Sequence, residues 1–164
     1  MAKSRFYLAY GSNLSVEQML RRCPDAVYVG TADLNNMRLN FRGSKTGSYL
    51  TVDPVKGETV PCLVWKVSDR DEAKLDIYEG YPKFYRKVNT KVDLYDLADG
   101  DLIRSIPAFY YRMDARKTIG IPSKYYLQVC FEGYKRFGFD LDVLDAAYDR
   151  AINRLKEAEY AVQW

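Results

Sequence analysis

The residue best suited to acid–base chemistry in this chain is Glu79, which is followed directly by Gly80. A helix is expected to begin at Ser68 and to run to about Tyr78, so that Gly80 acts as its C-terminal glycine. Glu79 would then lie at the negative end of the helix dipole, where a carboxylate is mildly disfavoured. Aromatic neighbours that could desolvate it are Tyr78, Tyr81, Phe84 and Tyr85. Both effects raise a carboxyl pKa toward the range of a general base, whereas the commoner state of such a glutamate is a solvated surface charge.

A turn near the N-terminus offers a second kind of chemistry, the binding of an anion. Residues 6–10 are predicted to form a strand, after which Gly11, Ser12 and Asn13 turn the chain toward Leu14 and a helix. N–H groups at the start of a helix lack partners within the helix and can hold a carboxylate or an oxyanion. The alternative is an ordinary connection between a strand and a helix.

The absence of histidine limits the chemistry that this chain can perform. It excludes Ser-His and Cys-His nucleophilic catalysis and most zinc sites, and we expect no metal site. Acid–base work near neutral pH must therefore fall to a carboxylate, lysine, tyrosine or cysteine with a shifted pKa. The three cysteines, Cys23, Cys62 and Cys130, are widely spaced and fit neither a disulfide framework nor a metal site. We expect them to be small buried residues in a reducing cytoplasm.

Length and composition predict one soluble globular domain over residues 1–164. Hydrophobic residues make up 48% of the chain and charged residues 29%, which is typical of that class. The net charge is only +3, and the basic residues are scattered rather than clustered, so neither nucleic acid nor a membrane is an expected partner. No apolar stretch approaches the roughly 20 residues needed to span a bilayer.

The order of the predicted elements indicates an α+β protein with a mixed, mostly antiparallel sheet. Asn35 and Asn36 are expected to form a hairpin turn, residues 53–57 a second turn, and residues 112–121 a surface loop. Strands are expected at residues 6–10, 27–34, 37–41, 49–52, 59–67, 86–95 and 102–111. Helices are expected to begin near Ser15, which has capping-box spacing to Gln18, and at Ser68, Ser123 and Asp140.

Three motifs resemble those of the γ-glutamylcyclotransferase-like family, which includes γ-glutamylamine cyclotransferases and AIG2-like proteins. The first is the string Y-G-S-N-L at residues 10–14, and the second is the pair Glu79-Gly80 followed by Tyr85. The third is Pro-Ser-x-x-Tyr at residues 122–126, which opens a C-terminal helix. The motifs occur in the family's order and span the chain from about residue 5 to about residue 137. The resemblance implies a small closed or nearly closed β-barrel with flanking helices and a pocket at one mouth.

The resemblance also implies a reaction and the roles of individual residues. The family converts a γ-glutamyl amide or amine into 5-oxoproline and the free amine, without a cofactor. Glu79 aligns with its catalytic acid–base residue, and Tyr10 lines the same pocket. The backbone N–H groups of Gly11, Ser12, Asn13 and Leu14 would bind the α-carboxylate or the oxyanion. Tyr85 and Tyr126 align with tyrosines that orient the substrate, and whether Tyr126 or its neighbour Tyr125 faces the pocket stays open.

Two questions remain open from the sequence. The Glu79–Tyr85 spacing is one residue shorter than in the glutathione-pathway enzymes. This leaves three alternative substrates: a γ-glutamyl amino acid, a γ-glutamyl amine, or a γ-glutamyl group attached to a small secondary metabolite. The second question is whether the chain is instead a non-catalytic pocket protein of the same fold that binds a small anionic or amino-acid-like ligand. The presence of Glu79 favours the enzyme. The leaving amine and the oligomeric state are not indicated by any motif.

Overall fold

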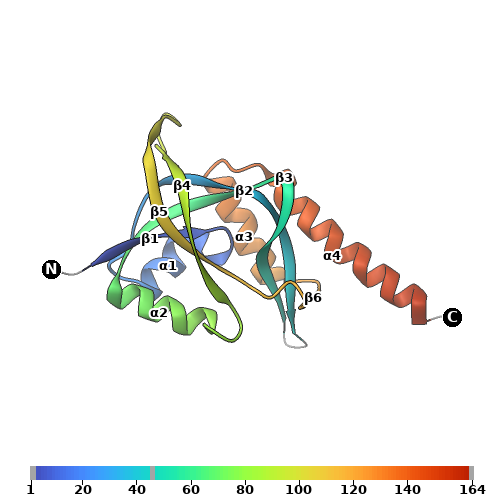
Figure 1. Ribbon diagram of the computed structural model, residues 1–164. Coiled ribbons are helices and arrows are strands. Elements are labelled where there is room, and N and C mark those ends of the chain that lie inside the picture. Colours follow the sequence, from blue (N-terminus) through green and yellow to red (C-terminus); the bar gives the residue numbers. More distant parts are fainter. Residues whose placement is uncertain (1–2, 45–46, 163–164) are drawn as a thin grey trace.

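The computed structural model describes residues 3–44 and 47–162, which form one mixed sheet with helices packed around it (Figure 1). The helical elements are η1, a 3-10 turn (Ser12–Leu14), α1 (Val16–Arg22), α2 (Asp69–Glu79), α3 (Lys124–Arg136) and α4 (Leu141–Val162). The strands are β1 (Ser4–Ala9), β2 (Val27–Ser44), β3 (Gly47–Ser68), β4 (Arg86–Tyr95), β5 (Leu102–Arg112) and β6 (Thr118–Ile119).

The strands form a ring that is barrel-like without being a strict barrel. Their order is β3-β1-β5-β4-β2-β6, and a further pairing of β3 with β2 closes the ring, with β6 attached to β2 outside it. All pairs are antiparallel except β1 with β5. β2 and β4 share the single registered pair Thr31–Tyr95, so the ring is weakly joined at that seam. The predicted α+β class with a mostly antiparallel sheet is confirmed.

Two predicted turns in the first half of the chain are wrong. Asn35 and Asn36 do not reverse the chain, because β2 continues through them to Ser44, and residues 53–57 lie within β3. The two long strands pair with each other from Val27–Lys66 at one end to Ser44–Gly47 at the other, and one register shift lies between Asn35 and Met37. Asn36 takes a φ of 58° and Gly57 a φ of 87°, and the Gly57 N–H donates to the Asn36 side chain at 3.0 Å. The turn-forming residues are thus used for a bulge, which bends the paired strands without ending them.

The observed helix starts agree with those predicted from the sequence. Each of three serines accepts the backbone N–H three residues ahead, which satisfies one unpaired donor of the first turn; these serines are Ser15, Ser68 and Ser123. Gly80 has a φ of 66° and ends α2, as predicted from its type. The predicted loop at residues 112–121 contains the short strand β6, which pairs with Arg42 and Gly43 of β2.

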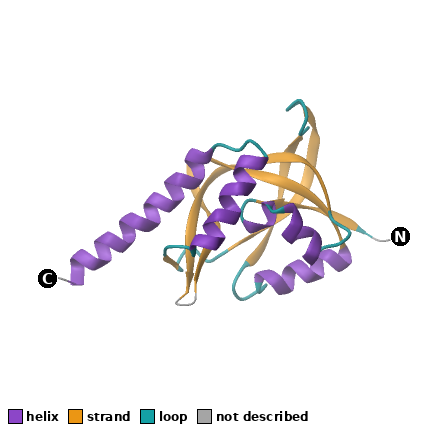
Figure 2. Cartoon of the chain, turned by 180° about the vertical axis from the view of Figure 1, so that it is seen from behind, coloured by secondary structure: helices purple, strands orange, loops and turns teal. Residues whose placement is uncertain are grey.

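The helices bring the N-terminal turn, α2 and α3 to one side of the ring, and α4 extends away from it (Figures 1 and 2). α1 contacts α2, and α3 contacts η1 and α4. The contact between α3 and η1 is close because position 133 is glycine: a β-carbon there would lie 2.5 Å from the β-carbon of Leu14. This approach brings the first turn of α3, which carries Tyr126, toward Gly11.

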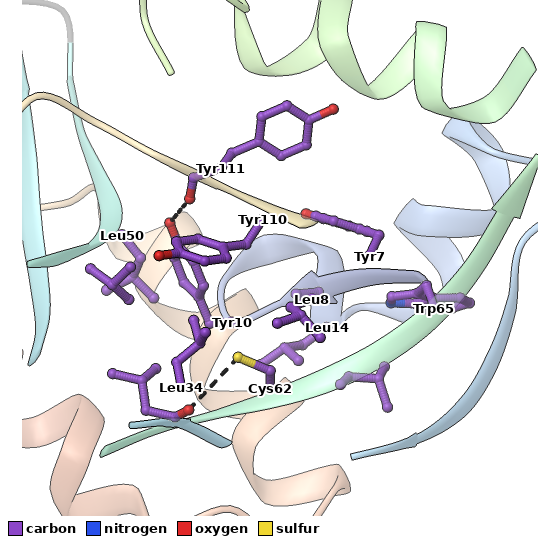
Figure 3. Packing of buried hydrophobic residues seen from close by; sticks show 14 of the residues in the cluster. Tyr7, Leu8, Tyr10, Leu14, Leu34, Leu50, Cys62, Trp65, Tyr110 and Tyr111 are labelled. Atoms are coloured by element: carbon purple, nitrogen blue, oxygen red, sulfur yellow. Dashed lines mark hydrogen bonds between the residues drawn. The ribbon is translucent and has the colours of Figure 1, made fainter. Parts of the chain in front are cut away.

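The core fills the ring and the space beneath the helices (Figure 3). Trp65, Phe41, Phe109 and Tyr134 are among its largest fully buried side chains. All three cysteines are buried free thiols, as predicted. Among the described residues, no helix is both long enough and apolar enough to cross a bilayer.

Candidate active site

A cavity of about 400 Å³ lies where the C-terminal end of α2 meets the turn after β1. Elements distant in the sequence form its wall, namely β1, η1, β3, α2, β5 and α3. Its lining residues are Tyr7, Leu8, Tyr10, Gly11, Ser12, Asn13, Tyr49, Leu50, Ile77, Tyr78, Glu79, Gly80, Phe84, Tyr85, Tyr111 and Tyr126. The structure therefore brings together Glu79, the Gly-Ser-Asn turn and the predicted tyrosines. Of the residues predicted for the site, Leu14 is the one outside this wall.

Glu79 carries the acid–base potential of the cavity. It is the last residue of α2, is half-buried, and faces a wall of aromatic side chains. Burial raises its pKa from 4.5 to about 7, and the positive charge of Arg22 partly opposes that rise. The sequence-based expectation of a raised pKa is confirmed, and desolvation is its main cause. A carboxyl with this pKa can both accept and return a proton near neutral pH.

The turn opposite Glu79 presents unpaired backbone donors. Within the described chain, the N–H groups of Gly11, Ser12 and Asn13 have no protein acceptor. The expectation for Leu14 needs correction, because its N–H donates to the Gly11 carbonyl at 3.0 Å and its side chain is buried in the core. A β-carbon at Gly11 would lie 3.1 Å from the hydroxyl oxygen of Tyr126, so a side chain at this position would crowd that hydroxyl group.

Three predicted tyrosines lie in the wall with their hydroxyls tied to the main chain. Tyr10 donates to the carbonyl of Tyr111 (Figure 3), and Tyr85 donates to the carbonyl of Leu50 at 2.8 Å. Tyr126 instead accepts the N–H of Leu50 at 3.0 Å. Burial raises the pKa of Tyr10, Tyr85 and Tyr126 well above the ordinary value, so all three stay protonated.

Tyr125 points away from the cavity, which answers the question left open by the sequence. Its side chain is 74% exposed, and its hydroxyl accepts the Gln18 amide at 3.3 Å. Tyr126, one residue later on α3, faces the cavity.

Sequence reasoning missed Arg22, which connects the elements around the site. Its guanidinium donates to the Asn13 side chain at 2.6 Å and to Gln18 at 2.9 Å, and it lies over the ring of Tyr78. The Asn13 amide in turn donates to the hydroxyl of Tyr7 at 3.0 Å. The spacing of Gln18 and Arg22, one helical turn apart, could have predicted their contact, but no sequence pattern indicates the contact of Arg22 with Tyr78.

A second polar group behind the wall was also missed. Tyr111 donates its hydroxyl to Asp76 at 2.5 Å, and the Lys87 ammonium contacts the same carboxylate at 2.8 Å. These contacts hold α2 against β4 and β5, and they keep Asp76 engaged outside the cavity. Glu79 is therefore the one carboxyl group among the described lining residues. In the part of the chain that the structure describes, no cluster of side chains is suited to hold a metal ion.

Comparison with known proteins identifies the family of this chain. Residues 7–128 match the family described as "Gamma-glutamyl cyclotransferase, AIG2-like", and this range contains every residue of the cavity wall. The chain belongs to this family. It is accordingly a cyclotransferase-type enzyme, and the resemblance found in the three sequence motifs is confirmed.

Relatives and solved structures agree with the family match. A gamma-glutamylcyclotransferase from Bos taurus is 28% identical over 166 residues, which cover 96% of this chain and 82% of the relative. One from Mus musculus is 35% identical over 81 residues, 45% of this chain and 43% of the relative. A solved gamma-glutamyl cyclotransferase superposes with a TM-score of 0.74 at 27% identity, covering 88% of this chain and 86% of the other. A mouse AIG2-like protein shares the fold, with a TM-score of 0.54 at 16% identity over 76% of this chain and 82% of the other.

Proposed function

We propose that this cyclotransferase converts a γ-glutamyl amide into 5-oxoproline and a free amine. The observation that carries the proposal is the placement of one carboxyl group, with a pKa near 7, across a cavity from unpaired backbone N–H groups. The α-amine of a γ-glutamyl group can attack its own γ-carbonyl and close a five-membered lactam. The enzyme then has to fold the substrate and move two protons from the α-nitrogen to the departing nitrogen, and such positioning can contribute several kcal/mol.

Glu79 is assigned the proton transfers. The α-amine has a pKa of about 8 and is largely protonated at neutral pH, so it must lose a proton before it can attack. The Glu79 carboxylate takes that proton, and the amine nitrogen forms a bond to the γ-carbonyl carbon. Glu79 passes this proton to the amide nitrogen, and the bond from the γ-carbonyl carbon to that nitrogen breaks. The ring nitrogen still carries one proton more than the neutral lactam, and Glu79 takes this second proton and releases it to the departing amine, which leaves as an ammonium ion. Proton transfer of this kind contributes roughly 10²–10⁴-fold.

The tyrosine hydroxyls suit two different parts of the substrate. Tyr10 and Tyr85 donate their protons to main-chain carbonyls, so their oxygens offer lone pairs to the α-ammonium group. Tyr126 accepts a main-chain N–H, so its proton can be donated to the γ-carbonyl oxygen as negative charge develops there. The N–H groups of Gly11, Ser12 and Asn13 complete the site by binding the α-carboxylate.

The test is incubation of the purified chain with a panel of small γ-glutamyl amides, without added metal or nucleotide, followed by measurement of 5-oxoproline. We expect lactam release from at least one amide, and its loss in Glu79→Gln. Binding of the same amides without lactam release by the wild-type chain would instead support the non-catalytic pocket protein.

Two further expectations belong to this proposal. Residues 1–164 act as a single domain, because the described strands and helices share one core. The enzyme works in the cytoplasm, where a reducing environment suits three buried free thiols. Its partner is the small γ-glutamyl substrate.

A further inference from the structure

The part of the cavity wall that remains after the glutamyl-binding groups are assigned is apolar. Besides Glu79, the turn and the three tyrosines, the wall contains Tyr7, Leu8, Gly80 and Tyr111. Its other five residues, here called the outer wall, are Tyr49, Leu50, Ile77, Tyr78 and Phe84. Three of these side chains are open to solvent: Ile77 is 82% exposed, Tyr78 45% and Tyr49 37%. Apolar side chains gathered at the entrance of a pocket indicate a ligand group that covers them, because exposed apolar area is otherwise unfavourable.

The charge of this outer wall is unfavourable to an anion. Ile77, Tyr78 and Glu79 form the last turn of α2, so the rim carries the negative end of the helix dipole. Among the described lining residues, none is a lysine or arginine. Arg22 lies nearby, but its guanidinium is engaged with Asn13 and Gln18.

Two cations of the described chain lie against outer-wall residues from outside the wall: Arg22, whose guanidinium carbon is 3.7 Å from the centre of the Tyr78 ring, and Lys117. The Lys117 ammonium lies 4.8 Å from the centre of the Phe84 ring, and Lys117 does not itself line the cavity. A cationic leaving amine would have Glu79 as its single acidic partner in the wall, and the mechanism requires that carboxyl group for proton transfer.

Resting on the proposed function, we propose that the group attached to the departing nitrogen is uncharged and apolar, an alkyl or aromatic group seated on Ile77, Tyr49 and Phe84. The γ-glutamyl half of the substrate is held by the polar end of the cavity. The leaving half lies across the apolar rim. Among the described residues there, Arg22 is engaged with Asn13 and Gln18 and Glu79 is needed for proton transfer, so a carboxylate or a second ammonium group finds no free counter-charge to replace its hydration. A site of this kind separates an apolar group from a charged group of the same shape by about tenfold or more.

The experiment compares three γ-glutamyl amides whose leaving amines differ mainly in charge. They are the amides of 4-methylpentylamine, which is apolar, 4-aminobutyrate, which is anionic, and 1,4-diaminobutane, which is cationic. We expect kcat/KM for the apolar amide to exceed that of both charged amides by at least about tenfold. Equal values, or a preference for either charged amide, would overturn the proposal.

Ile77→Lys tests the subsite directly. Because Ile77 is highly exposed, the variant should fold, and its melting temperature checks this. The variant should lose most of the preference for the apolar amide over the anionic one. Ile103→Lys is the matched control, because Ile103 is 49% exposed on β5 and lies outside the cavity wall; it should keep the wild-type ratio. An unchanged ratio in Ile77→Lys contradicts the assignment.

Lys117→Ala addresses the alternative in which Lys117 pairs with a leaving carboxylate. We expect the three values of kcat/KM to stay within about twofold of wild type, whereas a selective loss with the anionic amide would overturn the proposal.

Binding of the three amides to Glu79→Gln, measured by calorimetry, separates this inference from the proposed reaction. If no amide yields 5-oxoproline but the apolar one binds Glu79→Gln most tightly, the proposed reaction fails and the subsite stands. If lactam is released without an apolar preference in turnover or binding, the reaction stands and the subsite fails.

Discussion

The guanidinium carbon of Arg22 lies 3.7 Å from the centre of the Tyr78 ring, next to Glu79 in the last turn of α2. The same guanidinium donates to Asn13, and the Tyr78 hydroxyl lies 3.2 Å from the Ser12 hydroxyl. Arg22 therefore joins the helix end that carries the carboxyl group to the turn that carries the free N–H groups. Its charge also lowers the pKa of Glu79 against the larger effect of burial.

Replacing Arg22 should change the acidity of the site. In Arg22→Met the opposing positive charge is absent, so the pKa of Glu79 should rise and the acidic limb of the kcat/KM profile should move upward by about 0.5–1 pH unit. Arg21→Met is the matched control, because Arg21 is the exposed neighbour on the same helix. A midpoint that stays at the wild-type pH in Arg22→Met would show that Arg22 has no electrostatic influence on the base.

Glu79→Gln should separate catalysis from folding. The amide keeps the shape of the side chain but cannot accept the ammonium proton, so turnover should fall by at least about 100-fold while substrate binding persists. Turnover and calorimetric affinity are measured on the same sample, and Glu159→Gln on the exposed part of α4 serves as the control. Near wild-type turnover would remove Glu79 from the mechanism.

The same substitution should raise stability above neutral pH. The pKa of Glu79 is about 7 in the folded chain against an ordinary 4.5, so the folded state binds this proton more tightly than the unfolded state does. The wild type therefore loses stability as pH rises between these two values, and the glutamine variant does not. We expect Glu79→Gln to gain about 1–2 kcal/mol in unfolding free energy at pH 8 and nothing at pH 4, measured by denaturant titration. A destabilised variant at pH 8 would indicate a structural role.

The pH profile of the wild-type enzyme should be bell-shaped. The reacting state pairs ionised Glu79 with a protonated α-amine, so kcat/KM should fall below about pH 7 as Glu79 takes up a proton. It should fall again above about pH 8, where the free substrate has already lost its ammonium proton. The acidic limb must disappear from any residual activity of Glu79→Gln, and its persistence there would assign that limb to another group.

Gly11→Ala should damage the site with little effect on the fold. The added β-carbon would lie 3.1 Å from the Tyr126 hydroxyl oxygen, so Tyr126 has to shift by a few tenths of an ångström. We expect kcat/KM to drop by about tenfold, because small displacements of positioning groups are costly. In a Tyr126→Phe background the contact partner is absent, so Gly11→Ala should then cost much less; full additivity of the two losses would show that they are independent.

The features that sequence could predict are those set by neighbouring residues. The serine caps, the glycine end of α2 and the raised pKa of Glu79 depend on a few adjacent positions, and each is confirmed. The hairpin predicted at Asn35 and Asn36 failed because those residues also suit a bulge, and the choice depends on β3. Arg22 was missed for the same reason, since its contact with Tyr78 forms only when α1 and α2 pack together.

Leu50 connects the site to the stability of β3. In the described residues β1 pairs with β3 only from Leu63 to Ser68, so β3 has an open edge at Leu50. Its N–H donates to Tyr126 and its carbonyl accepts from Tyr85, so both main-chain groups of this buried residue have partners. Replacing both tyrosines by phenylalanine would therefore leave these two groups without partners inside the protein, and would lower the free energy of unfolding as well as disable the pocket.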